Sequence, residues 1–336
     1  MKIVRYGWFT LLALFMLRIG VGFHFFGEGF DKIRNPKPFS THFFMAAKGP
    51  YADEFHAMAW DADGLVRLGY QANTDTGFPE VEMKATKEFW EAYAKSVSRH
   101  YRFSKEQNKE CDRIVGDYLV LVDQFVNGYR DVKGKFIPGY EAELIEYFQA
   151  VERRENDRGD DVRQNVATLR GQVATWEGEI AQKRAPLLAQ VESLWRGLEA
   201  DLNRVVENTD LEGALVKEME QHKKQIKKPW LAIGKIGRKR VDSVAIDRVI
   251  PWFDCTVGIL LILGLFTRVA SLAGAVFLSG VVVTQWPGAV GAASTWPQLI
   301  EMLAMLTLAA VGAGQFGGLD YFVGIYCRSK KREENE

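Results

Sequence analysis

The sequence predicts an all-α protein, in which a four-helix transmembrane bundle carries an extracytoplasmic α-helical insert domain. Two observations predict this architecture: four apolar stretches lie near the two ends of the 336-residue chain, and a long polar segment lies between them. An α-helix rises about 1.5 Å per residue, so each stretch is long enough, or nearly so, to cross a hydrocarbon core of about 30 Å. The stretches are residues 6–27, 249–266, 269–286 and 297–316.

The first stretch, residues 6–27, has two interpretations. Lys2 and Arg5 supply the positive start that a secretory signal peptide also has. The apolar run is too long for such a peptide, however, and no small-residue cleavage site follows it. We therefore expect an uncleaved first transmembrane helix within residues 1–32.

Lysine and arginine near the apolar stretches predict the orientation. Lys2 and Arg5 precede the first stretch, Arg268 lies in the turn between the second and third, and the charged tail 325–336 follows the fourth. Cytoplasmic loops carry an excess of Lys and Arg. The sequence thus predicts a multi-pass protein of the bacterial cytoplasmic (inner) membrane, with both termini cytoplasmic and the insert extracytoplasmic. A basic run at residues 235–240 opposes this, but long translocated loops are largely exempt from the rule.

Residues 33–248 form the predicted insert. Proline and glycine signals at residues 35–79 predict short helices and loops, after which apolar residues recur at helical spacing. Ser104 is the expected N-cap between two helices. A heptad-like stripe over residues 166–205 is typical of coiled-coil-like packing, and Pro186 should kink or end its helix. Strict alternation is missing, so no strand is predicted.

The insert shows little that indicates catalysis. The segment Asp61-Ala62-Asp63-Gly64 is similar to half of a calcium loop, but the downstream ligands are missing, so a solvated turn is expected. The three cysteines and five histidines have no metal-ligand spacing, and a net charge of zero gives no support for nucleic-acid binding. We expect a spacer or docking module, with residues 86–208 recruiting an envelope or redox partner.

Ionisable side chains interrupt the first apolar helix, where charge is costly and often functional. His24, Glu28 and Lys32 follow each other at intervals of four residues and so lie on one face of the helix. Arg18 lies about 9–15 Å deeper, given the rise per residue. The spacing predicts a polar ladder that rises to the outer surface, with Arg18 as the counter-charge to a buried carboxylate.

The other apolar stretches carry polar groups at a similar depth. Asp254 lies in the first outer turns of the second, and Gln298 and Glu301 lie near the outer start of the fourth. Asp254 or Glu301 is the expected partner of Arg18. The predicted intramembrane polar site contains Arg18, His24, Glu28, Lys32, Asp254, Gln298 and Glu301.

Two interpretations of this site stay open. A structural polar network would fix the register of the helices. Alternatively, the groups would bind a small polar or quinone-like headgroup, with the carboxylates and His24 moving protons.

Three segments resemble DoxX/DoxD-like membrane proteins. Residues 17–33 read LRIGVGFHFFGEGFDKI, which is similar to the opening of that family. Residues 254–274 read DCTVGILLILGLFTRVASLAG, with an acidic residue followed by GLFTR. Residues 298–320 read QLIEMLAMLTLAAVGAGQFGGLD, an acidic helix ending in Gly-x-Gly and Leu-Asp. The large insert departs from the compact pattern of the family.

The resemblance implies a four-helix membrane bundle, and named members are linked to thiosulfate:quinone oxidoreduction or to oxidative-stress homeostasis alongside partner proteins. We therefore expect a membrane component of a redox system that handles quinone and receives electrons from a partner. The rival is a non-enzymatic membrane scaffold whose insert recruits an envelope protein, so whether the chain is an enzyme stays open. The motif residues carried over by position are Arg18, Glu28, Lys32, Asp254, Arg268, Glu301 and Asp320.

Overall fold

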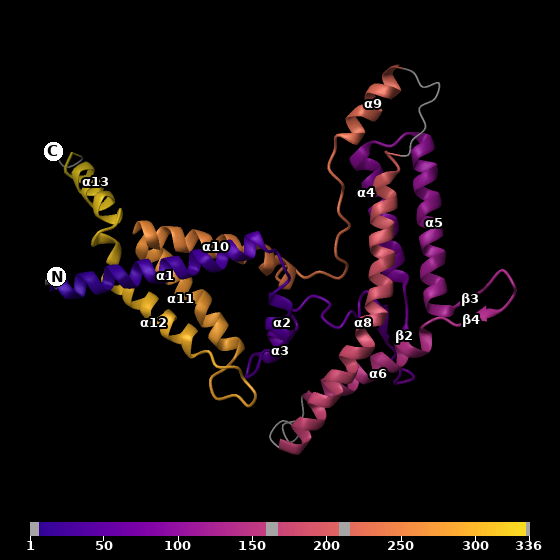
Figure 1. Ribbon diagram of the computed structural model, residues 1–336, viewed down its shortest axis with the longest axis horizontal. Helices are drawn as coiled ribbons and strands as arrows, with labels where there is room; N and C mark the ends of the chain where they lie inside the picture. Colours follow the sequence, from indigo (N-terminus) through magenta and orange to yellow (C-terminus); the bar gives the residue numbers. More distant parts are fainter. Residues whose placement is uncertain (1–6, 159–166, 208–215, 334–336) are drawn as a thin grey trace. The chain divides into compact units, whose positions relative to one another are not determined.

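The computed structural model describes residues 7–158, 167–207 and 216–333, and it is mostly helical. The chain divides into two compact units (Figure 1). The terminal unit combines Met1–Ala62 with Lys239–Glu336, and the central unit is Asp63–Arg238. Segments from the two ends of the chain therefore pack into one body.

Four helices form the body of the terminal unit. Helix α1 packs against α10 and α12, and α11 packs against α10 and α12. Their shared core contains Phe25, Leu261 and Met305. The bounds of these helices are Trp8–Arg34 for α1, Ser243–Leu263 for α10, Thr267–Thr284 for α11 and Trp296–Val311 for α12.

Two of the described helices, α1 and α11, are long and apolar enough to cross a membrane, and α12 is a shorter apolar helix. Helix α10 has a comparable length but carries Asp247, Arg248 and Asp254. Length and composition thus support two candidate spans, and four spans stay a prediction.

Glycines allow α1 and α10 to approach closely. A Cβ atom at Gly29 would lie 2.6 Å from the backbone nitrogen of Cys255, and one at Gly258 would lie 2.5 Å from that of Phe26. Since only glycine lacks this atom, both positions exclude larger residues. This close crossing sets the register between the polar residues of α1 and those of α10.

Short segments complete the terminal unit. Helix α2 (Ser40–Met45) packs against α10 and against α3 (Ala52–His56). The 3-10 turn η1 (Ala313–Gln315) follows α12, and α13 (Asp320–Glu333) continues the helical structure into the predicted charged tail.

The central unit is built on long helices. Helix α8 packs against α4, α5 and α6. Trp90, Val122, Phe148 and Leu198 are buried in the shared core. The bounds are Lys84–Tyr101 for α4, Lys105–Asn127 for α5, Glu141–Arg158 for α6, Ala167–Arg204 for α8 and Val216–Ile226 for α9.

Two predictions about these helices can be judged. Ser104 is the N-cap of α5, and it forms a capping box with Gln107, as predicted. Pro186 lies inside α8, so it does not end that helix. The stripe of residues 166–205 supplies core residues such as Leu187 and Leu198. Its side chains before residue 175 lie outside the described ones.

The prediction of an all-α fold is incomplete, because the central unit also contains two antiparallel hairpins. Strand β1 (Tyr70–Ala72) pairs with β2 (Pro79–Val81), and β3 (Tyr129–Arg130) pairs with β4 (Phe136–Ile137). Strands of two or three residues are too short to show the alternation by which a strand is recognised in a sequence.

Candidate functional site

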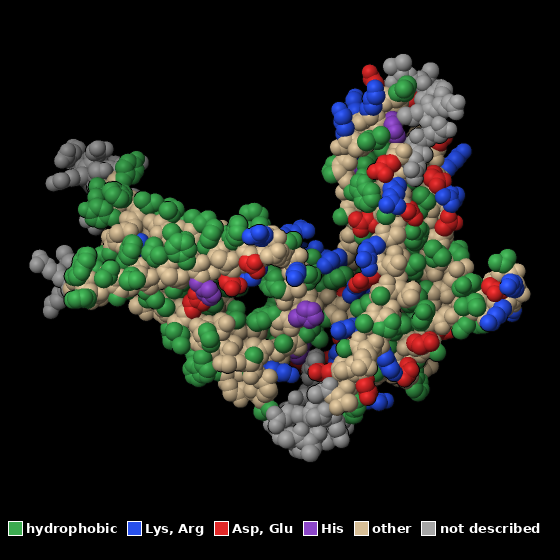
Figure 2. Space-filling view, viewed as in Figure 1, with side chains coloured by type: hydrophobic (Ala, Val, Ile, Leu, Met, Phe, Trp, Pro, Cys, Tyr) green, Lys and Arg blue, Asp and Glu red, His purple; other side chains and the backbone are tan. Residues whose placement is uncertain are grey.

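The terminal unit contains an open cavity of about 270 Å³ between its four long helices. In the space-filling view, hydrophobic side chains cover most of these helices, and a small group of acidic and histidine side chains interrupts them (Figure 2). The lining residues are His24, Phe25, Glu28, Lys32, Asp254, Phe277, Leu278, Val281, Gln298 and Glu301.

Asp254 and Lys32 form the buried side of the cavity. Lys32 Nζ donates a hydrogen bond of 2.8 Å to Asp254 Oδ2, and it lies 3.6 Å from Glu28 Oε2. The side chain of Asp254 is 3% exposed, whereas that of Glu28 is 57% exposed. Asp254 Oδ1 is buried and has no hydrogen-bond partner. A buried acceptor without a partner is costly, so this oxygen indicates a place for a donor.

His24 and Glu301 form the second polar pair. Nδ1 of His24 lies 2.7 Å from Oε1 of Glu301. The histidine side chain is 58% exposed and the glutamate side chain 14% exposed, so the pair connects the inside of the cavity with its mouth. Gln298 lies three residues before Glu301 on α12, and its Oε1 is a second buried acceptor without a partner.

The remaining wall of the cavity is apolar. Phe25 and Phe277 lie edge to face, with ring centroids 6.4 Å apart. Leu278 and Val281 continue this wall along α11. These residues were not predicted as part of the site, because the type of an apolar residue does not show whether its side chain faces a cavity or lipid. The site therefore has a charged end and an aromatic side.

Arg18 does not line the cavity, which corrects one prediction. Its Nη1 donates to the carbonyl oxygen of Ala313 at 3.2 Å, and its Nη2 donates to that of Gly317 at 3.0 Å. Glu28 is ten residues further along α1, or about 15 Å. The backbone of the turn after α12 supplies acceptors nearer to the guanidinium than any carboxylate of the cavity. The counter-charge of Asp254 is Lys32.

The structure thus brings six of the seven predicted site residues to one cavity and leaves Arg18, near the middle of α1, outside it. That these six residues act as a functional site stays a prediction.

Asp320 and Arg268, two further residues that the resemblance pointed to, contact the turns that lie near Arg18. Asp320 accepts hydrogen bonds from the backbone nitrogens of Phe266 at 2.7 Å and Thr267 at 3.0 Å, so it caps the start of α11. Arg268 packs against Gly312, where a Cβ atom would lie 2.8 Å from its Nε. These contacts join the turn between α10 and α11 to the turn that follows α12.

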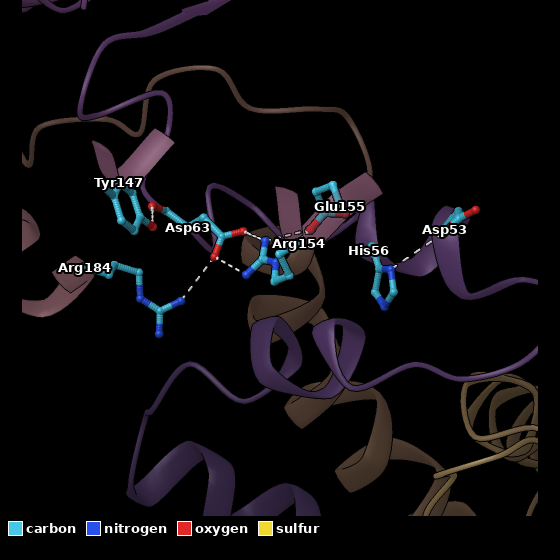
Figure 3. A network of polar contacts seen from close by, with 7 residues as sticks. All are labelled: Asp53, His56, Asp63, Tyr147, Arg154, Glu155 and Arg184. Carbon is cyan, nitrogen blue, oxygen red and sulfur yellow. Dashed lines mark hydrogen bonds and ion pairs between the residues drawn. The ribbon is translucent and has the colours of Figure 1, made fainter. Parts of the chain in front are cut away.

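The central unit holds a different polar network, around Asp63 (Figure 3). Arg154 donates to Oδ1 of Asp63 at 3.0 Å and to Oδ2 at 2.5 Å, and Arg184 donates to Oδ1 at 3.3 Å. The hydroxyl of Tyr147 donates to the backbone oxygen of Asp63 at 2.7 Å. Asp63 is 9% exposed, so the expected solvated turn is wrong at this residue. Its partners lie about a hundred residues away, where a local motif gives no sign of them.

Within the described ranges, no group of three or more His, Cys, Asp or Glu residues could hold a metal ion. The polar groups of the cavity are instead suited to hydrogen bonding, with oxygen acceptors on three helices and an ammonium donor on α1.

Comparison with known families concerns the C-terminal part of the chain. Residues 238–335 match the family model of the TQO small subunit DoxD. The resemblance found in the sequence is confirmed for this segment, which contains α10, α11 and α12 and so supplies Asp254, Gln298 and Glu301 to the cavity. Helix α1 and the central unit lie outside the matched residues. No curated protein and no solved structure matches the chain.

Proposed function

We propose that the terminal unit is the membrane component of a redox system similar to thiosulfate:quinone oxidoreductase, and that its cavity holds the headgroup of a quinone. The observation that supports this is the meeting of Lys32, Asp254, Glu301 and His24 beside the aromatic wall of Phe25 and Phe277. A quinone headgroup is a flat ring with an oxygen at each end. It needs apolar faces for the ring and polar groups for the oxygens.

The size of the cavity suits a headgroup. Pockets that enclose whole drug-sized ligands measure about 300–1,000 Å³, and this one measures about 270 Å³. A ring fits inside, and an isoprenoid tail would extend into the bilayer. In this proposal the ring packs against Phe25 and Phe277, whose mutual edge-to-face arrangement gives it a defined position.

The polar groups can manage the protons of the reaction. Reduction of a quinone to its hydroquinone takes up two electrons and two protons. His24 lies 2.7 Å from Glu301 and connects it with the mouth of the cavity, and an imidazole ring can both accept and donate a proton. We assign proton exchange to this pair and the holding of the headgroup to Lys32 and Asp254. A partner protein supplies the electrons.

All four long helices span the membrane in this proposal. The acidic residues of α10 are compatible with a span, since Asp254 faces Lys32 and Asp247 accepts hydrogen bonds from the backbone nitrogens of Phe39 and Ser40. Trp286 and Trp296 are exposed where α11 ends and α12 begins. Tryptophan is enriched at membrane interfaces, which supports an outer boundary at this level.

The central unit then lies outside the membrane and acts as a docking module for an envelope or redox partner. It has its own buried core, which is expected of a domain that folds around its own residues. Its role stays a prediction that deletion of residues 86–208 tests, by loss of a reproducible co-purifying partner.

The quinone proposal is tested by titrating a short-chain quinone into the full-length protein in lipid nanodiscs. The parent should bind, and Glu28→Gln and Asp254→Asn should each change the affinity. Asp31→Asn is a matched control, because Asp31 is an exposed acid on the same helix that bonds to Asn35 and does not line the cavity. Binding that none of the three substitutions changes would contradict the proposed site.

A further inference from the structure

We propose that the cavity prefers the reduced, hydroxyl-bearing form of its headgroup and excludes anions such as thiosulfate. The inference rests on the proposed function and adds which redox form the site holds and which substrate it cannot hold. It follows from the balance of acceptors, donors and charge among the lining residues.

The two buried polar atoms of the cavity that have no hydrogen-bond partner are both acceptors. Oδ1 of Asp254 and Oε1 of Gln298 are both buried and without a hydrogen-bond partner. A hydroquinone has O–H groups that donate to such oxygens, whereas a quinone has only carbonyl oxygens. An acceptor that faces another acceptor leaves both unpaired in a site shielded from water, which is costly. The two oxygens therefore favour the reduced form.

Donors on Lys32 and His24 are engaged with carboxylates of the same cavity. Lys32 has three N–H groups, of which one bonds to Asp254, and Glu28 lies 3.6 Å from the same nitrogen as an ion-pair partner. The Nδ1 atom of His24 is engaged with Glu301. Lys32 thus retains an N–H group for a carbonyl oxygen of a quinone, for which Glu28 at 3.6 Å competes. The hydroquinone uses this donor as well, because a hydroxyl both donates and accepts.

The charge of the cavity opposes anions. Glu28, Asp254 and Glu301 are three carboxylates, and among the described lining residues Lys32 is the single Lys or Arg. The three carboxylates outnumber the ammonium group and the imidazole, so the formal charge of the lining is negative. A dianion such as thiosulfate would be repelled, and the repulsion is strong where water is excluded. The oxidation of thiosulfate therefore belongs to a partner protein.

The test compares binding of a short-chain benzoquinone with binding of its hydroquinone, by calorimetry without oxygen, to the full-length protein in nanodiscs. Because a buried acceptor without a partner is costly, the hydroquinone should bind about tenfold tighter. Added thiosulfate should not displace it. Asp254→Asn exchanges an acceptor oxygen for an N–H donor of the same shape, so it should reduce or reverse the preference.

Gln298→Met removes the second acceptor and should also reduce the preference, while Asp31→Asn should retain it. Quinone binding by Asp254→Asn would show that this variant is folded. Equal binding of the two forms by the parent, tighter binding of the quinone, or displacement by thiosulfate would overturn the inference and leave the proposed function intact. If the parent bound neither form, the proposed function would fail as well.

Discussion

Each unit of the chain contains a buried aspartate with a polar network around it. The network in the central unit stabilises the fold, whereas the network in the terminal unit is open to a ligand. Asp63 in the central unit has both carboxylate oxygens bonded to arginine, and Oδ1 has two such partners. Asp254 in the terminal unit has one oxygen bonded to Lys32 and the other without a partner. The first network is complete in the folded chain, whereas the second needs a donor from outside.

The difference also extends to the surroundings of each aspartate. Two guanidinium groups face Asp63, so positive charge compensates the buried carboxylate. One ammonium group is shared between Asp254 and Glu28, with Glu301 in the same cavity. Removal of the Asp63 carboxylate should therefore leave arginine charge in the central unit without compensation. Removal of the Asp254 carboxylate should instead reduce the repulsion among the carboxylates of the terminal unit.

The largest effect on stability is expected for Asp63→Ala. Breaking a buried ion pair leaves a charge without compensation, and such losses cost about 3–5 kcal/mol. Arg154 retains a 2.7 Å bond to Glu155, so we expect about 3 kcal/mol, the lower end of that range. Denaturant unfolding of the full-length protein, followed in the central unit, measures this change.

Asp117→Ala is the control for that experiment. Asp117 pairs with Arg113 on the surface of α5, with both side chains 60% exposed, so its removal should leave the transition unchanged. Asp254→Ala should destabilise the terminal unit less than Asp63→Ala destabilises the central unit, because Lys32 keeps Glu28 nearby. A larger loss from Asp254→Ala would refute the distinction between the two networks.

A smaller effect is expected from Gly29→Leu, which acts on the crossing that places Lys32 beside Asp254. A side chain here meets the backbone of Cys255 and Pro251 at 2.6 Å, and overpacking of this kind costs about 1–3 kcal/mol. Binding of the headgroup should weaken too. Thermal unfolding and quinone titration in nanodiscs measure both changes.

Gly20→Leu is the matched control, since a Cβ atom at Gly20 meets nothing within 4 Å on the same helix. Leucine favours the helix over glycine by up to about 1 kcal/mol, so this variant should be as stable as the parent or more stable. Equal losses from the two substitutions would show that helix packing at Gly29 does not position the site.

Most residues of the cavity could be predicted from the sequence, because their spacing within a helix shows which of them share a face. His24, Glu28 and Lys32 share a face by their spacing alone, and the predicted direction of the helices placed Asp254 and Glu301 at the same level. Arg18 was assigned wrongly because its partners are backbone oxygens of a non-helical turn. Depth along a helix can be counted from a sequence, whereas the path of such a turn cannot.

The central unit was less predictable because its decisive contacts are long-range. The Asp63 segment resembles half of a calcium loop, and its arginine partners lie 91 and 121 residues later in the chain. The capping box at Ser104 was recognisable, since all of its parts lie within four residues. The ends and the buried faces of helices could therefore be predicted from the sequence. The distant side chains that neutralise a buried charge could not.

The smallest effect concerns Cys111, whose reactivity reports on the folding of the central unit alone. Burial, with a smaller contribution from Asp112, raises the pKa of this thiol to about 11. The thiolate is the reactive form, and at pH 8 its fraction should be more than a hundredfold below that of an ordinary cysteine of pKa about 8.5. Alkylation at pH 8, followed by peptide mass spectrometry, should be very slow in the native protein and fast after unfolding.

This probe also tests whether the two units respond separately. Asp63→Ala should shift the unfolding transition seen at Cys111 to lower denaturant, because both residues belong to the central unit. Gly29→Leu should leave that transition in place, since it acts within the terminal unit. If Gly29→Leu moved the Cys111 transition as far as Asp63→Ala, the two units would unfold together. The different stability effects of Asp63 and Asp254 could then not be attributed to two units that unfold independently.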